Sequence, residues 1–160
     1  MFFLITGGAR SGKSTLAVNI GRSHLGKVIF IATAPNLDDD MSERIKRHQL
    51  ERPEWETIEE ECEILSHLKR GKSGDLLIVD CITLWVSNLL FHGKTEKEII
   101  DAAIEIGQVA RTSPCAFVMV TNEVGMGIHP ETDLGREYRD LLGKVNQILV
   151  KESTKALFVI

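Results

Sequence analysis

A glycine-rich stretch near the start of the chain has the residue types and spacing of a phosphate-binding loop. It fits the pattern G-x-x-x-x-G-K-[ST] and consists of Gly7, Gly8, Ala9, Arg10, Ser11, Gly12, Lys13 and Ser14. Glycines let the backbone N–H groups turn towards a phosphate, and we expect Lys13 to reach the β- and γ-phosphates of a nucleoside triphosphate. The Ser14 hydroxyl suits Mg²⁺. A chance match is the alternative, but a strand-like run precedes the loop and a helical pattern follows it.

Asp80 is the second candidate for nucleotide chemistry. It ends a run of four aliphatic residues, 76–79, which is the arrangement of a carboxylate that completes the coordination of Mg²⁺ in nucleotide-hydrolysing proteins. Ser14 and Asp80 are therefore the predicted metal ligands. The alternative is an ordinary aspartate at the end of a strand that caps the helix beginning at Ile82.

His48 is a candidate nucleophile. Helical spacing would place Arg44, His48 and Arg52 on one face, at positions i, i+4 and i+8. Two guanidinium groups disfavour protonation of the imidazole and can hold a phosphate in front of it. Such a histidine can accept a nucleotidyl group as a phosphoramidate. A solvated histidine on a polar helix is the alternative.

Apolar runs of strand length alternate with longer helical patterns along the chain. Strands are predicted at 2–6, 28–32, 57–58, 76–80, 116–121 and 156–160, and helices at 14–23, 38–52, 60–69, 82–91, 95–111 and 134–150. This alternation predicts one α/β domain over residues 1–160, with a P-loop NTPase-like fold and a mostly parallel sheet that has helices on both faces. Ligands bind at the carboxyl ends of the strands in such folds.

Composition excludes several classes of protein. The net charge of −4 argues against a general nucleic-acid surface, and the longest apolar stretch, 76–91, is too polar to span a membrane. Cys62, Cys81 and Cys115 are too widely spaced for a zinc site, so we expect reduced thiols and a cytoplasmic protein.

Four segments together resemble one family. They are the loop at 5–14, the stretch from Arg44 to Pro53, the run at 80–90 and the block from Val120 to Glu131, in which Thr-Asn-Glu-Val-Gly-Met-Gly is the most specific part. The chain is similar to the bifunctional adenosylcobinamide kinases and adenosylcobinamide-phosphate guanylyltransferases of cobalamin biosynthesis. The match continues through Gly135, Arg136, Arg139, Asp140, Gly143, Asn146 and Gln147.

The resemblance implies two activities. The family phosphorylates adenosylcobinamide with a nucleoside triphosphate, ATP or GTP, and then transfers GMP from GTP to adenosylcobinamide phosphate through a guanylylated histidine, which His48 matches. Besides the loop, it implies nucleotide contacts from Thr33, Ala34, Pro35, Gln49, Leu50, Glu51, Arg52, Glu59 and Asp80. It also implies a homo-oligomer, expected to be a trimer. Relatives usually continue for a short segment past Ile160, so a shortened chain would have a weaker last strand.

Two other functions stay open from the residues alone. A single-activity small-molecule kinase needs only the loop and Asp80, and a nucleotide switch would bind a protein partner. The switch is disfavoured because the chain lacks the Asn-Lys-x-Asp motif with which GTPase switches recognise guanine; Asn122 is followed by Glu123 and Val124 instead. Asn122 and Glu123 either position substrate or shape their loop.

Several other residues are expected to be structural or to lie in solvent: His24, His67, His92, His129, Trp55 and Trp85. Arg136, Arg139 and Asp140 are expected to bind substrate or to join subunits.

Overall fold

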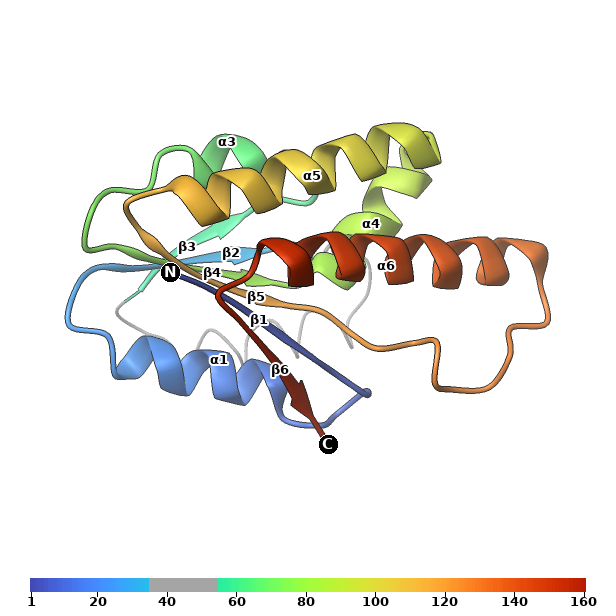
Figure 1. Ribbon diagram of the computed structural model, residues 1–160, viewed down its shortest axis with the longest axis horizontal. Coiled ribbons are helices and arrows are strands. Elements are labelled where there is room, and N and C mark those ends of the chain that lie inside the picture. Colours follow the sequence, from blue (N-terminus) through green and yellow to red (C-terminus); the bar gives the residue numbers. More distant parts are fainter. Residues whose placement is uncertain (35–54) are drawn as a thin grey trace.

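The structure is a computed structural model that describes residues 1–34 and 55–160 (Figure 1). Its strands are β1 (Phe2–Gly7), β2 (Val28–Ala32), β3 (Glu56–Glu59), β4 (Leu76–Asp80), β5 (Ala116–Val120) and β6 (Lys155–Val159). Its helices are α1 (Lys13–Arg22), α3 (Ile64–Leu68), α4 (Ile82–Phe91), α5 (Glu96–Thr112) and α6 (Asp133–Glu152). The helix expected at 38–52 lies outside the described residues. No described helix is both long enough and apolar enough to cross a bilayer.

The strands of the described residues form one sheet in the order β3-β2-β4-β5-β1-β6, and every neighbouring pair is parallel. The expectation of a mostly parallel sheet is therefore confirmed. The two central strands β4 and β5 are almost continuously buried, as expected for strands that are covered on both faces. All carboxyl ends meet at one edge of the sheet, which we call the carboxyl edge.

Helices cover both faces of the sheet, as the alternating pattern predicts. Figure 1 shows α1 under one face and α3, α5 and α6 over the other. Successive residues of β1 point to opposite faces, so that Leu4 packs in the larger core under α4, α5 and α6, and Ile5 packs in the smaller core against α1. These two cores hold the sheet rigid, which keeps the strand ends in place.

The start of α5 follows the signal seen in the sequence. Thr95 is the N-cap, and its hydroxyl accepts a hydrogen bond from the Glu98 N–H at 3.3 Å. The Glu98 carboxylate accepts one in return from the Thr95 N–H at 2.8 Å. The predicted capping box is therefore present, and it satisfies two N–H groups that the helix itself leaves unpaired.

The helix expected at 60–69 is much shorter than predicted, because α3 covers only Ile64–Leu68. The Glu60 carboxylate accepts hydrogen bonds from the N–H groups of Cys62 and Glu63, at 3.0 and 2.8 Å. These bonds hold the chain in a turn before the helix begins. The prediction was wrong for these first residues because a side chain replaced the helical hydrogen bonds.

Candidate active site

The predicted phosphate-binding loop connects β1 to α1 at the carboxyl edge. Arg10 and Gly12 have positive φ angles of 58° and 93°, and Gly12 is the N-cap residue of α1. Gly12 adopts its angle without steric cost because it has no Cβ. The backbone therefore turns sharply and enters α1 directly, so that the loop lies at the positive end of the helix dipole, where phosphate is favoured.

The Lys13 side chain is folded back into this loop. Its exposed fraction is only 6%, and its ammonium donates hydrogen bonds to the Gly8 carbonyl and to Ser11 Oγ, the latter at 3.4 Å. Burial lowers the pKa of Lys13, while the nearby Cys81 and Asp80 act in the opposite direction. A buried ammonium favours an anionic ligand because the negative charge of the ligand compensates for the hydration that burial removes. The loop is thus suited to receive phosphate.

Asp80 ends β4 at the same edge as Lys13. It lies close enough to influence the pKa of the Lys13 ammonium. Cys81, rather than Asp80, is the N-cap residue of α4. The alternative role of Asp80 as the cap of that helix is therefore not supported. The Asp80 carboxylate and the Ser14 hydroxyl, in the first turn of α1, are hard oxygen donors that fit Mg²⁺.

Thr33 follows β2 and is completely buried. Its hydroxyl donates to the Cys81 carbonyl and accepts from the Cys81 N–H, both at 2.7 Å, and its own N–H donates to the Asp80 carbonyl at 3.1 Å. The Thr33 side chain thus joins the end of β2 to the end of β4. Its hydroxyl is already used for this purpose, which leaves Ala34, half-buried beside it, as the more accessible of the two predicted nucleotide contacts.

Glu59 ends β3 and lines a pocket of about 490 Å³. Asn88 supports this region from α4, where its side-chain N–H groups donate to the carbonyls of Thr33 and Glu61 at 2.9 and 3.0 Å. The Trp85 indole donates to the Cys62 carbonyl at 2.8 Å and is almost fully buried. The pocket is therefore held in place by α4, and Trp85 is a packing residue as predicted.

The segment after β5 also reaches the phosphate-binding loop. The Glu123 N–H donates to the Gly7 carbonyl at 3.0 Å. Thr121 is completely buried, and its hydroxyl donates to the Asn146 side-chain carbonyl at 2.8 Å. Sequence alone does not connect these residues, because Asn146 is far along the chain from Thr121. One feature of the sequence could have pointed to Asn146. It is a polar residue directly after Val145, on α6, a helix whose apolar face packs on the sheet.

The predicted site residues that lie outside the described residues are Pro35, His48, Gln49, Leu50, Glu51 and Arg52. The described ones, from the loop, Thr33, Ala34, Glu59 and Asp80, all lie at the carboxyl ends of β1, β2, β3 and β4. The fold thus brings together residues from distant parts of the chain along a single edge.

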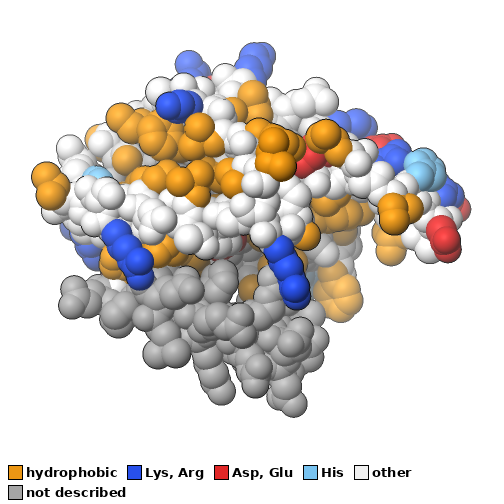
Figure 2. Space-filling view, turned by 90° about the horizontal axis from the view of Figure 1, so that it is seen from below, with side chains coloured by type: hydrophobic (Ala, Val, Ile, Leu, Met, Phe, Trp, Pro, Cys, Tyr) orange, Lys and Arg blue, Asp and Glu red, His pale blue; other side chains and the backbone are white. Residues whose placement is uncertain are grey.

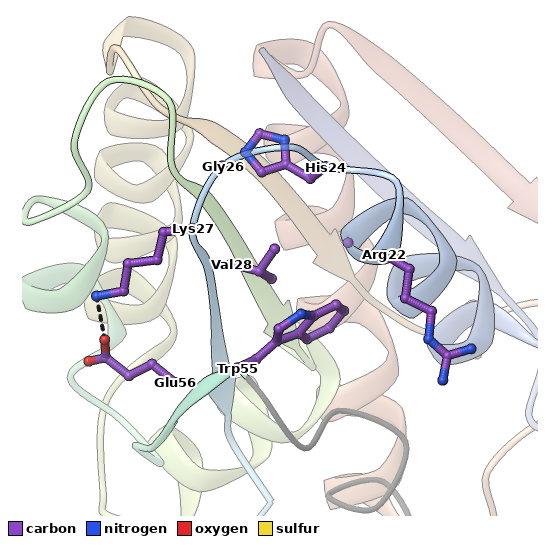
Figure 3. Close-up of a pocket in the computed structure, with 8 residues that line it drawn as sticks. Arg22, His24, Gly26, Lys27, Val28, Trp55 and Glu56 are labelled. Carbon is purple, nitrogen blue, oxygen red and sulfur yellow. Dashed lines mark ion pairs between the residues drawn. The ribbon is translucent and has the colours of Figure 1, made fainter.

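Another pocket, of about 400 Å³, lies at the opposite edge of the sheet (Figure 3). The Trp55 ring forms part of its wall, and Lys27 and Glu56 form an ion pair of 2.6 Å at its side. Val28 begins β2 here, so this pocket is separated from the loop by the length of the strands. Trp55 also packs over Gly21, which agrees with its predicted structural role.

The segment between β5 and α6 projects from the body of the protein (Figure 1). Met126 and Ile128 are exposed there, and the projecting end in Figure 2 carries hydrophobic and charged side chains together. His129 is exposed, and its Nδ1 lies 2.8 Å from the Arg139 guanidinium. Arg139 in turn pairs with Asp140 at 2.8 Å.

The comparisons with known proteins decide the family. The model of the cobinamide kinase / cobinamide phosphate guanyltransferase family, CobU, matches residues 3–160. The chain belongs to this family. The bifunctional adenosylcobalamin biosynthesis proteins CobU of Escherichia coli (strain K12) and Salmonella typhimurium (strain LT2) are 39% and 40% identical to it, and each match covers 100% of this chain and 96% of the relative. The CobP protein of Pseudomonas aeruginosa (strain PAO1) is 35% identical over 98% of this chain and 91% of its own length.

A solved structure supports the fold independently. It comes from a study of a prototypical ATPase from the type III secretion system of pathogenic bacteria, and it superposes with a TM-score of 0.60 at 14% identity. The match covers 92% of this CobU-family chain and 49% of the ATPase chain. At this identity the likeness concerns the fold alone, and it agrees with the predicted α/β architecture.

Proposed function

We propose that this enzyme phosphorylates adenosylcobinamide with a nucleoside triphosphate and then transfers GMP from GTP to the product, giving adenosylcobinamide-GDP. Family membership over nearly the whole chain supports both half-reactions. The observation that carries the chemistry is the buried Lys13 ammonium inside a loop at a helix N-terminus, with Asp80 beside it.

In the kinase half-reaction, the loop binds the triphosphate and presents its γ-phosphoryl group to the substrate hydroxyl. The loop N–H groups and Lys13 stabilise the negative charge that develops between the β- and γ-phosphates. The substrate oxygen forms a bond to the γ-phosphorus, the bond from that phosphorus to the bridging oxygen breaks, and the hydroxyl proton is released.

In the transferase half-reaction, His48 acts as the nucleophile. A ring nitrogen of His48 forms a bond to the α-phosphorus of GTP, and pyrophosphate leaves. A phosphate oxygen of adenosylcobinamide phosphate then attacks the same phosphorus and releases the histidine. Lys13 and the loop stabilise the departing pyrophosphate, so that one loop serves both steps.

Ser14 and Asp80 are the residues that we propose to hold Mg²⁺. Both supply oxygen ligands, which Mg²⁺ prefers, and they belong to neighbouring elements at the carboxyl edge. The ion would supply charge neutralisation between the phosphates. Pro35, Gln49, Leu50, Glu51 and Arg52, together with Thr33, Ala34 and Glu59, are the further proposed nucleotide contacts.

We also propose that the protein forms a homo-oligomer, a trimer by family resemblance, and acts in the cytoplasm. The exposed apolar side chains of Met126, Ile128 and Leu134, with exposed fractions of 79%, 96% and 67%, support association, since such side chains gain free energy when they are covered. Light scattering of the purified protein tests the number of subunits.

The deciding experiment uses GTP labelled with ³²P at the α-position. The protein is incubated with labelled GTP and Mg²⁺ and then quenched, and the protein-bound label is tested for lability in acid and stability in alkali. Acid-labile label on the parent chain that is absent from His48→Ala is the expected result. If the parent binds nucleotide but gains no label, the transferase half of the proposal fails and a single-activity kinase becomes the better assignment.

A further inference from the structure

The segment that follows β5, Thr121 and Asn122, leaves the sheet at its carboxyl edge. Strand β5 lies between β4, which ends in Asp80, and β1, which leads into the phosphate-binding loop (Figure 1). Val120 is paired with Asp80 on one side and with Ile5 on the other. The chain that leaves β5 therefore emerges between the two parts of the proposed nucleotide site.

A closed ring of hydrogen bonds fixes Asn122 at this position. The Thr121 hydroxyl donates to Asn146 Oδ1 at 2.8 Å, and Asn146 Nδ2 donates to the Asn122 carbonyl at 3.1 Å. The Asn122 N–H donates to Thr83 Oγ1 at 2.7 Å. Thr83 Oγ1 and Thr121 Oγ1 are 3.4 Å apart, and since the Thr121 hydrogen already points to Asn146, the Thr83 hydroxyl is the donor of this pair.

This ring holds both backbone groups of Asn122. Thr83 and Thr121 are buried, with exposed fractions of 8% and 0%, so the ring lies in a region of low dielectric where each hydrogen bond is costly to break. Helix α6 adds a further bond, from the Tyr138 hydroxyl to the Thr83 carbonyl at 2.9 Å. Asn122 is thus held by Thr83 of α4 and Asn146 of α6, together with its neighbour Thr121 after the end of β5.

The side chains of Asn122 and Glu123 are used differently. The Glu123 carboxylate accepts hydrogen bonds from the N–H groups of Gly125 and Met126, at 2.5 and 3.2 Å, and so shapes its own loop. The Asn122 side chain is half-buried, and no hydrogen bond to its amide is found among the residues that the structure describes. Its backbone is fixed, while its amide is left available at the edge where phosphate is expected.

We propose that the side-chain amide of Asn122 donates a hydrogen bond to the γ-phosphoryl group of the bound triphosphate and positions that group for transfer. The inference rests on the proposed function. A neutral amide stabilises the phosphoryl oxygens as a pre-oriented dipole, which needs no reorganisation while charge moves during the reaction. Asn122 would then be a catalytic residue, and Thr83, Thr121 and Asn146 would be positioning residues.

The test compares GDP with the non-hydrolysable β,γ-imido analogue of GTP. Losing one hydrogen bond to a charged group should weaken binding of the analogue to Asn122→Ala by about tenfold and leave GDP binding within about twofold of the parent. Asn122→Asp has the same shape but brings a negative charge to the γ-phosphate, so it should bind the analogue more weakly than Asn122→Ala does. Asn19→Ala, an exposed position on α1, is the matched control.

Two binding results would overturn the assignment. One is an unchanged ratio of analogue to GDP affinity in Asn122→Ala. The other is an Asn122→Asp variant that binds the analogue as well as the parent does, because this would indicate a role in shaping the loop or holding a cation. Both comparisons remain valid if the parent does not phosphorylate adenosylcobinamide, in which case only the proposed function fails.

The phosphorylation rate separates the two proposals further. With adenosylcobinamide as substrate, Asn122→Ala should lower kcat by about 100-fold, with a smaller change in KM, since the contact tightens in the transition state. Full kcat in the variant, with an active parent, would remove Asn122 from the mechanism and leave the proposed function standing. Thr121→Val should lower kcat by loosening the ring, and Thr121→Ser, which keeps the hydroxyl, should restore it.

Discussion

Gly7 lies directly against the main chain of Val159. A Cβ atom built on Gly7 would be 2.1 Å from the Val159 carbonyl oxygen, and the φ angle of Gly7 is 150°. The first residue of the phosphate-binding loop is thus packed against the end of the last strand, β6. No larger residue fits at this position without moving one of the two strands.

Gly7→Ala should therefore destabilise the protein and weaken nucleotide binding. The added methyl group meets backbone rather than a flexible side chain, so a loss of about 1–3 kcal/mol in the free energy of unfolding is expected. Chemical denaturation and GDP titration measure the two effects. Gly143→Ala is the matched control, because a Cβ there has no heavy atom within 4 Å and α6 is helical at this position. A Gly7→Ala variant as stable as the parent would contradict the contact.

Lys13→Met should lower both the phosphorylation rate and the guanylylation rate by about 100-fold or more, since one buried cation serves both steps. The melting temperature should stay the same or rise, because the substitution removes an ammonium whose burial is unfavourable. Rate measurements with γ- and α-labelled GTP, together with thermal melting, check both parts. Lys151→Met, at an exposed position of α6, should change neither rate. Normal turnover in either half-reaction would contradict the shared loop.

Asn88→Leu should weaken nucleotide binding from a distance. The carbonyls of Thr33 and Glu61 would lose their donor within a buried region, which should cost about 1–3 kcal/mol of stability. The ends of β2 and β3 would then be less firmly held, and GDP affinity should fall. Isothermal titration and denaturation measure this, with Asn19→Leu as the exposed control. If stability falls while affinity is unchanged, Asn88 supports the fold alone.

Glu98 makes the stability of α5 depend on pH. Hydrogen bonds from the Thr95 N–H and hydroxyl, with a further one from Lys94, lower the pKa of Glu98 to about 2. The folded protein therefore favours the ionised carboxylate more than the unfolded chain does. This stabilisation is fully present above the ordinary glutamate pKa of 4.5 and is lost as the pH falls towards 2. Glu98→Gln should thus lower the melting temperature at pH 6 and change it little near pH 2.

The control for this substitution is Glu137→Gln, at an exposed position of α6. It should leave the melting temperature close to that of the parent at each pH. A difference between Glu98→Gln and the parent that grows as the pH falls would have the wrong sign for a lowered pKa.

The parts of the site that are contiguous in the sequence were predictable. Residues 7–14 form a complete motif, and the aliphatic run before Asp80 indicates a buried strand without any knowledge of its neighbours. The polar ring was not predictable, because Thr83 in α4, Thr121 after β5 and Asn146 in α6 meet only after these elements are packed together. The late start of the helix predicted at 60–69 was not predictable either, because it depends on the Glu60 carboxylate accepting hydrogen bonds from the backbone N–H groups that follow it. The role of His48 stays a prediction.

The position of β1 in the sheet also affects how the protein is made. Its two neighbours are β5 and β6, so the strand that carries the phosphate-binding loop pairs only with the last third of the chain. During synthesis, β2 and β4 can pair before β1 has a partner. The apolar residues of β1 stay unpaired until residue 116 and those after it have left the ribosome. Such long-range pairing slows folding. We therefore expect a nascent chain to acquire nucleotide affinity only at the end of translation, which would prevent incomplete chains from sequestering cellular GTP.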